Sequence, residues 1–301
     1  MRVALEASTH SGWISELLAE FGHEVLVANP RKVRSISAGT RKNDRMDARQ
    51  LARLARVDPQ LLSPIRHRGR QARYDLILIR AREELVKTRT LMINAVRGLV
   101  KSVGDRLPSC SSEYFHAKIR EFIPEALKVA LLPLVEQIEA LTKGIRGYDE
   151  AISKMAAEKY PDTLLLQQVQ GVGALTALTF MLTIEYPDRF QKSRDVGPYF
   201  GLVPKQHESG DSSPQLRITK TGDTMVRRLL VGSAHFALGP FGEDSDLRKF
   251  GQAIAERGGK NAKKRAVVAV ARKLAVLLHR LWVTGEVYEP RGYKPQTKIA
   301  A

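Results

Sequence analysis

Short apolar runs alternate with helically spaced apolar residues over the first part of the chain. Val3-Ala4-Leu5 and Val25-Leu26-Val27-Ala28 are short and continuous, which is typical of strands in a buried parallel sheet. Between them lies a helical pattern that ends at Gly22, and a further helix is predicted to begin near Asp44. We therefore predict an α/β unit over residues 1–65.

The pattern changes in the middle of the chain. Residues 66–160 carry apolar residues at helical spacing among many Arg, Lys and Glu, interrupted at Leu107-Pro108-Ser109. The heptads are imperfect, so a helical arm or hairpin is favoured over a long regular coiled coil. Residues 161–290 indicate a compact, mainly helical domain, and residues 291–301 a tail.

The charge balance indicates a polyanionic partner. Of the 301 residues, 49 are Lys or Arg and 32 are Asp or Glu, which gives a net charge of +17. Nucleic acid is the favoured partner, because cationic side chains release counterions from its backbone. A ribosomal-type or membrane-surface protein would fit the charge as well. The single cysteine excludes an intrachain disulfide and a cysteine-based zinc site. Without a secretory segment or an apolar run of about 20 residues, a cytoplasmic protein is expected.

Three acids are candidate ligands for a metal ion. Asp44 and Asp47 lie three apart at a helix start and so share a face, where their oxygens could hold Mg²⁺. Alternatively, Asp44 caps the helix and Asp47 is a first-turn acid favoured by the helix dipole. Glu6 ends the first predicted strand, and functional residues of α/β sheets gather at the carboxyl ends of strands. Glu6 is therefore a candidate third carboxylate, with an ordinary solvated acid as the alternative.

Two further features could contact phosphates. The Gly171-Val172-Gly173 turn resembles that of a helix-hairpin-helix, in which glycines allow close approach of a phosphate backbone; a plain interhelical turn is the alternative. A basic helix is predicted from Lys260 to Trp282. Between Arg257 and Arg280 there are cations and no acid, including Lys260, Lys263, Lys264 and Arg265. An unbalanced run of this length favours nucleic-acid binding over a merely solvated face.

A serine near a cationic cluster is a candidate nucleophile. Ser233 follows a set of cations that could neutralise phosphates, namely Arg217, Lys220, Arg227 and Arg228. Nearby cations would lower the cost of a serine alkoxide attacking phosphorus. No sequence neighbour is an obvious base, and a small packing serine between Gly232 and Ala234 is the alternative. The histidines show no metal-ligand spacing, and no phosphate-binding loop of an NTP-driven motor is present.

The order of the motifs resembles the DEDD-type insertion-sequence transposases. These are the Piv/MooV-related recombinases, some of which are guided by a bridge RNA. The N-terminal matches are Leu5-Glu6-Ala7-Ser8, Gly22-His23-Glu24-Val25, Asn29-Pro30 and Lys42-Asn43-Asp44-Arg45-Met46-Asp47-Ala48. The C-terminal matches are Gln170-Gly171-Val172-Gly173, Phe190, Phe200-Gly201-Leu202-Val203-Pro204, Ser209-Gly210, Ile218-Thr219-Lys220-Thr221-Gly222 and Arg227-Arg228-Leu229-Leu230.

The resemblance implies an RNase-H-like (RuvC-like) domain, an arm and a C-terminal transposase domain. It implies four Mg²⁺-binding acids, of which Glu6, Asp44 and Asp47 match the last three, and a serine that forms a covalent bond to DNA. Ser233 is the only serine in the matching helix, with Phe236 as the alternative register. Lys42, within the acidic motif, is expected to be a further nucleic-acid contact. The implied partners are donor and target DNA, a structured guide RNA and further copies of the chain.

The family's first Asp would lie upstream of Met1, so we expect impaired metal chemistry in this chain. Three hypotheses follow from the resemblance and that departure. The first is a transposase that cuts and rejoins DNA through Ser233. The second is a catalytically impaired remnant that binds nucleic acid, and the third is a metal-dependent junction nuclease that uses water.

Overall fold

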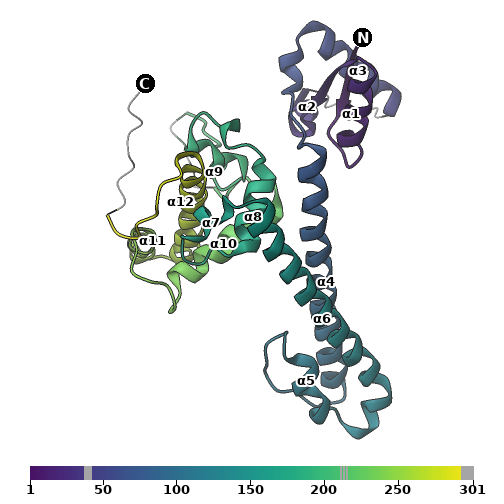
Figure 1. The fold of residues 1–301 in the computed structure, drawn as a ribbon, viewed down its shortest axis with the longest axis vertical. Helices are drawn as coiled ribbons and strands as arrows, with labels where there is room; N and C mark the ends of the chain where they lie inside the picture. Colours follow the sequence, from purple (N-terminus) through teal and green to yellow (C-terminus); the bar gives the residue numbers. More distant parts are fainter. Residues whose placement is uncertain (37–42, 211, 213, 215, 293–301) are drawn as a thin grey trace. The chain divides into compact units, whose positions relative to one another are not determined.

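The computed structural model describes residues 1–36, 43–210, 212, 214 and 216–292. The chain forms two compact units, Met1–Arg70 and Gln71–Ala301, and each is described here by itself. Figure 1 shows the small sheet with its helices in the first unit and the long helices of the second.

The first unit is built on two parallel strands. Strand β1 (Arg2–Glu6) pairs with β2 (Glu24–Ala28), with Glu6 opposite Ala28. The remaining elements of this unit are α1 (Ser11–Glu20), α2 (Pro30–Ile36), α3 (Asp44–Val57) and the 3₁₀ turn η1 (Pro59–Leu62). Both predicted strands, the helix between them and the helix beginning at Asp44 are confirmed. The broader RNase-H-like fold stays a prediction.

A small apolar core joins α3 to the sheet. Leu51, Leu54 and Ala55 of α3 pack with Ala4 of β1 and with apolar residues of β2. These α3 positions share one helical face, and burying them removes apolar surface from water. This packing fixes which side of α3 faces the sheet.

The second unit begins with a helical hairpin. Helices α4 (Arg70–Ser102) and α6 (Lys128–Lys159) pack through apolar residues near both ends of the hairpin. Between them lie α5 (Phe115–Ile119), η2 (Arg120–Phe122) and η3 (Glu125–Leu127). The predicted helices on either side of a break at Leu107-Pro108-Ser109 are confirmed, whereas a separate arm and a coiled-coil geometry stay predictions.

The rest of the second unit packs around one long helix, α12 (Ala262–Thr284). Residues of α12 contribute most to a large apolar core that also includes Phe180, Phe200 and Leu230. The other elements are α7 (Thr163–Gln167), α8 (Ala174–Ile184), η4 (Pro187–Arg189), η5 (Ser193–Asp195), α9 (Val196–Tyr199), α10 (Thr224–Leu238) and α11 (Asp246–Glu256). The mainly helical character predicted for this region is confirmed. The hairpin and these helices form one compact unit. A domain boundary near residue 160 stays a prediction.

The basic helix begins later than predicted. We expected it from Lys260, but α12 starts at Ala262, because Gly258 and Gly259 adopt left-handed φ values of 73° and 88° and form a turn. Lys260 therefore lies on that turn and not on the helix. Among the helices of the described residues, none combines the length and the hydrophobicity that a membrane-spanning segment needs.

Candidate functional site

The three predicted metal-binding acids come from two elements of the first unit. Glu6 is the last residue of β1, and Asp44 and Asp47 lie in the first turn of α3. The cap of α3 is Asn43, whose side chain accepts a hydrogen bond from the backbone N–H of Met46 at 2.8 Å. The alternative role of Asp44 as the cap is therefore wrong, and both aspartates lie at the positive end of the helix dipole.

Glu6 and Asp47 lie on the sides of β1 and α3 that carry the apolar contacts between the two elements. Ala4 and Leu51 pack together in the apolar core between the two elements. Glu6 lies two positions after Ala4, and so on the same side of the strand. Asp47 lies one helical turn before Leu51, and so on the sheet-facing side of α3. The local structure therefore directs the strand acid and the helix acid toward the same layer.

Carboxylate oxygens suit a hard divalent cation such as Mg²⁺. Glu6 and Asp44 are exposed, Asp47 is half-buried, and none of them is ion-paired with another described residue. As placed, however, no three or more His, Cys, Asp or Glu side chains among the described residues form a group that could hold a metal ion. The donor chemistry fits, while the convergence of all three acids stays a prediction.

Ser233 lies on α10 and lines a shallow pocket in the second unit. The residue is only 4% exposed, and its hydroxyl makes no hydrogen bond to another described residue. The pocket has a volume of about 430 Å³ and is lined by three elements and a turn, through Arg82, Glu83, Val86, Gly171, Thr176, Arg228, Leu229, Gly232, Ser233 and Phe236. The predicted serine and the first glycine of the predicted turn therefore meet in one place.

The glycine turn is shaped by both backbone and packing. Gly171 has a left-handed φ of 85°, and a Cβ at this position would lie 3.1 Å from Phe236 and 3.2 Å from the carbonyl oxygen of Ser233. Gly173 is the N-cap of α8, which has no side-chain cap. The close approach to α10 explains the need for a glycine at 171. Phosphate contact by this turn stays a prediction.

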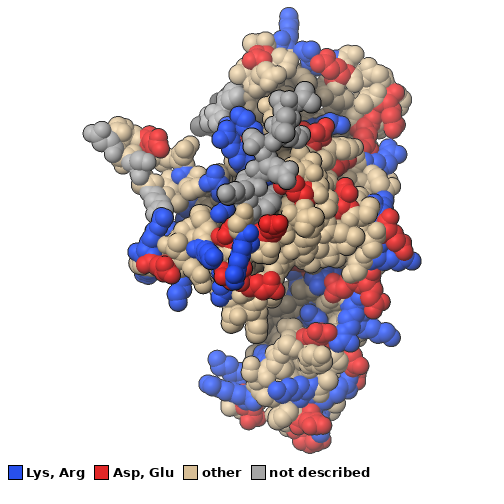
Figure 2. Space-filling view, turned by 60° about the vertical axis from the view of Figure 1, so that its left-hand side comes forward, with Lys and Arg blue, Asp and Glu red and all other residues tan. Residues whose placement is uncertain are grey.

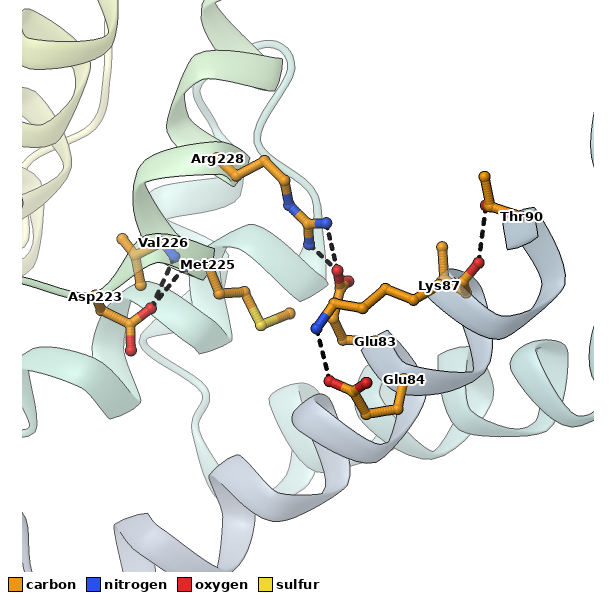
Figure 3. A network of polar contacts seen from close by, with 9 residues as sticks. Glu83, Glu84, Lys87, Thr90, Asp223, Met225, Val226 and Arg228 are labelled. Carbon is orange, nitrogen blue, oxygen red and sulfur yellow. Dashed lines mark hydrogen bonds and ion pairs between the residues drawn. The ribbon is translucent and has the colours of Figure 1, made fainter. Parts of the chain in front are cut away.

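Arg228, predicted to bind nucleic acid, is paired with a carboxylate that the sequence did not single out. Figure 3 shows its guanidinium facing Glu83 of α4, with contacts from Nη1 to Oε1 and, at 2.6 Å, from Nη2 to Oε2. The Glu83 side chain is 8% exposed and that of Arg228 is 52% exposed. The hydrogen bonds to Glu83 raise the pKa of Arg228, while burial opposes this shift. The bidentate pair ties the serine helix to the hairpin.

Arg227 is used inside the protein. It is 9% exposed and donates to the carbonyl oxygens of Phe200 at 3.0 Å and Thr221 at 2.6 Å, and to the Thr224 hydroxyl at 3.2 Å. A Cβ on the neighbouring Gly222 would lie 2.0 Å from a backbone oxygen, so two segments cross closely here. Arg227 stabilises this crossing, and we leave it out of the nucleic-acid surface proposed below.

Other predicted phosphate contacts are exposed. Arg217 and Lys220 lie on the segment before α10, and Lys220 has an unusual left-handed φ of 54°. The cations around the start of α12 are also exposed, namely Lys260, Lys263, Lys264 and Arg265. On the face shown in Figure 2, patches of Lys and Arg alternate with patches of Asp and Glu. Lys42 lies outside the described residues.

Glu83 is the residue that sequence reasoning missed. Its neighbour Glu84 is exposed and pairs with Lys87 on the same helix at 2.6 Å, as shown in Figure 3. Glu83 instead follows Leu76 by seven residues and Ile79 by four, so it lies on the apolar stripe of α4. An acid on such a stripe needs a partner when buried, and that was the available signal.

Comparisons with known proteins identify the family. Residues 163–250 match a family model described as "Transposase IS116/IS110/IS902 family". Residues 1–104 match a second model, described as a transposase, of the DEDD type.

The chain is also similar to individual transposases. It is 32% identical to the transposase for insertion sequence element IS1111A of Coxiella burnetii over 258 residues, which cover 82% of this chain and 68% of that protein. It is 28% identical to putative transposase y4pF/y4sB of Sinorhizobium fredii over 303 residues, 98% of this chain and 76% of that one. A pilin gene-inverting protein of Moraxella lacunata is 29% identical over 114 residues, 38% of this chain and 34% of that protein. The resemblance read from the motifs is therefore confirmed, and the chain belongs to the IS110/IS116/IS902 family of insertion-sequence transposases.

Proposed function

We propose that this transposase cuts and rejoins DNA through direct attack by Ser233. The Ser233 Oγ forms a bond to the phosphorus of a DNA phosphodiester, the bond from phosphorus to one deoxyribose oxygen breaks, and that oxygen leaves with a proton. The reverse attack by a deoxyribose hydroxyl rejoins the strand and releases the serine. The observation that carries this proposal is that the Ser233 hydroxyl lines a pocket together with the glycine turn and forms no hydrogen bond with another described residue.

We assign Glu6, Asp44 and Asp47 to a divalent-metal site, with Mg²⁺ as the ion. When bound, the cation would stabilise charge that develops on the phosphate oxygens. One contact supports the convergence of the acids: Arg2 at the start of β1 donates to the carbonyl oxygen of Ala55, near the end of α3, at 3.3 Å. Eight residues of helix rise about 12 Å and four residues of strand about 13 Å. A helix running along β1 from that contact would bring Asp47 level with Glu6.

The partners follow from charge and exposure. We assign phosphate contacts to the exposed cations outside the pocket, namely Arg217, Lys220, Lys260, Lys263, Lys264 and Arg265. DNA is the substrate, and we propose a structured RNA as guide, with the protein acting in the cytoplasm. Exposed apolar residues on α4, among them Leu91 at 70% and Ile77 at 57%, support a homo-oligomer joined through the hairpin.

The test is a trapped covalent complex. Supercoiled donor and target DNA, incubated with the protein, its RNA and Mg²⁺, should yield a protein–DNA adduct that survives denaturation and disappears in Ser233→Ala. Ser102→Ala, a change to an exposed serine at the end of α4, serves as the matched control and should keep the adduct.

The other hypotheses predict different products. Cleavage without an adduct that persists in Ser233→Ala would identify hydrolysis by water. Binding without cleavage by the wild-type chain would identify a nucleic-acid-binding protein that lacks strand transfer. Either result would refute serine attack.

A further inference from the structure

Helix α3 carries a stripe of arginines that the acidic site does not use. Arg45, Arg49, Arg53 and Arg56 are all exposed. At 3.6 residues per turn, these four positions fall within about 80° of arc and span about 16 Å of the helix axis. The stripe lies opposite Leu51, which packs toward the sheet. The cations therefore form one outward-facing row.

Within the described part of the chain, no acid forms an ion pair with these arginines. None of them has an acid three or four positions away in the sequence, where an ion pair on the helix surface could form. None forms a hydrogen bond or an ion pair with another described residue. Neighbouring like charges along a helix destabilise it. An external polyanion would relieve this repulsion.

Arginines on the helical hairpin behave differently. Arg120 pairs with Glu139 at 2.8 Å, and Arg146 pairs with Glu113 at 2.9 Å. The Arg120 side chain is 40% exposed and that of Arg146 is 54% exposed, yet the charge of each is already neutralised within the protein. The stripe on α3 is thus distinguished by unpaired charge and not by the number of arginines.

The stripe is also separate from the acids on the same helix. Asp47 lies on the sheet-facing side with Leu51, whereas the arginines face away from it. A nucleic-acid strand placed at the acids for cleavage would therefore not lie along the stripe. The row fits a second length of backbone that is held and not cut.

We propose that the α3 stripe of Arg45, Arg49, Arg53 and Arg56 binds the phosphodiester backbone of a nucleic-acid segment distinct from the scissile strand. The recognised chemistry is a row of phosphates, which duplex DNA and structured RNA both offer. Arginine suits this role because its planar guanidinium donates two parallel hydrogen bonds to phosphate oxygens. The contact requires nucleic-acid binding only, so it does not depend on strand transfer by Ser233.

The test is the salt dependence of binding by the full chain. Arg49→Gln/Arg53→Gln is compared with wild type and with Arg120→Gln/Arg146→Gln, which removes the same charge from ion-paired positions. The probes are a random-sequence DNA duplex and an RNA hairpin, titrated separately across a range of salt concentrations. Each lost phosphate contact reduces the magnitude of the negative slope of log K against log salt by about 0.9 on duplex DNA. The stripe variant should therefore lose about 1.8 from the magnitude of the slope on the DNA duplex if the stripe binds DNA, and a comparable amount on the base-paired RNA hairpin if it binds RNA.

The result also names the source of the backbone. A loss with the duplex alone assigns the stripe to DNA, a loss with the hairpin alone assigns it to RNA, and a loss with both assigns it to the shared phosphate chemistry. An unchanged slope with both probes overturns the proposal. A loss equal to that of the Arg120→Gln/Arg146→Gln control variant also overturns it. Thermal melting of each variant shows that the fold is retained, and the outcome is independent of whether Ser233 forms an adduct.

Discussion

Arg228→Ala should destabilise the second unit because it leaves a nearly buried carboxylate without its partner. Glu83 is 8% exposed and loses both contacts of its bidentate pair, while Arg228 itself is half-exposed. Breaking a fully buried pair costs about 3–5 kcal/mol, and breaking an exposed pair about 0–1 kcal/mol. With one partner in each environment, we expect a loss of about 2 kcal/mol. Glu83→Gln should cost about 1 kcal/mol, because the amide oxygen still accepts from the guanidinium.

A double-mutant cycle isolates the interaction. Arg228→Ala combined with Glu83→Gln should cost less than the sum of the single changes, with a coupling of about 1 kcal/mol, because the neutral amide no longer leaves a buried charge. Urea unfolding followed by the fluorescence of Trp282, which packs against the core around α12, reports on this unit. Trp13→Phe removes the other of the two tryptophans, which lies in the first unit.

Arg120→Ala is the matched control. It breaks an ion pair with Glu139 in which both side chains are about half-exposed, at 40% and 53%, and should change stability by no more than about 0.5 kcal/mol. If Arg228→Ala proves as mild as this control, or if the cycle shows no coupling, the pair does not hold α10 to the hairpin.

Three further changes test other parts of the structure. Gly171→Ala should cost about 1–3 kcal/mol in urea unfolding, because φ is 85° and the new Cβ meets Phe236, whereas Gly173→Ala, with open space around it, should stay within about 0.5 kcal/mol; equal effects would contradict the close approach. Arg227→Ala should cost about 2–3 kcal/mol through its lost hydrogen bonds, and the exposed Arg217→Ala almost nothing, so a mild Arg227→Ala would argue against its buried role. Burial raises the pKa of Asp75, but hydrogen bonds from Lys159, Tyr160 and Gln71 lower it below its ordinary value. The ionised carboxylate of Asp75 therefore stabilises the fold at pH values above its ordinary pKa, and this stabilisation is lost as the pH falls through its lowered pKa. The free energy of unfolding should consequently fall less steeply in acid for Asp75→Asn than for wild type.

Local sequence signals were sufficient for the elements but not for their partners. The strand at Val3-Ala4-Leu5 and the helix from Asp44 follow from short-range patterns, and the structure confirms both. The cap of α3 was misassigned by one residue, because Asn43 and Asp44 are equally good caps in sequence and only the backbone decides which one precedes the first turn. The late start of α12 likewise depends on the left-handed glycines before it.

The candidate site shows the same limit more strongly. Ser233 and Gly171 were each named from the sequence, but their meeting on one pocket depends on how α10 packs on the turn before α8. Glu83 could not be paired with Arg228 from sequence, because the two residues are 145 positions apart. Contacts at that separation are set by tertiary packing, which no local period reveals.

Charge illustrates why partners matter more than counts. The net charge of +17 indicates a polyanion but does not say which cations meet it. Arg227 and Arg228 were prominent in sequence, yet the first serves backbone carbonyls and the second a buried carboxylate. The stripe that includes Arg49 was not prominent, yet it has neither acids at helical spacing nor partners in the described fold. A cation that is already paired must give up its partner before it can bind a phosphate, while an unpaired one need not. The surplus is therefore available for nucleic acid on α3 and at Lys260, Lys263 and Lys264 around the start of α12, and much less so beside Ser233.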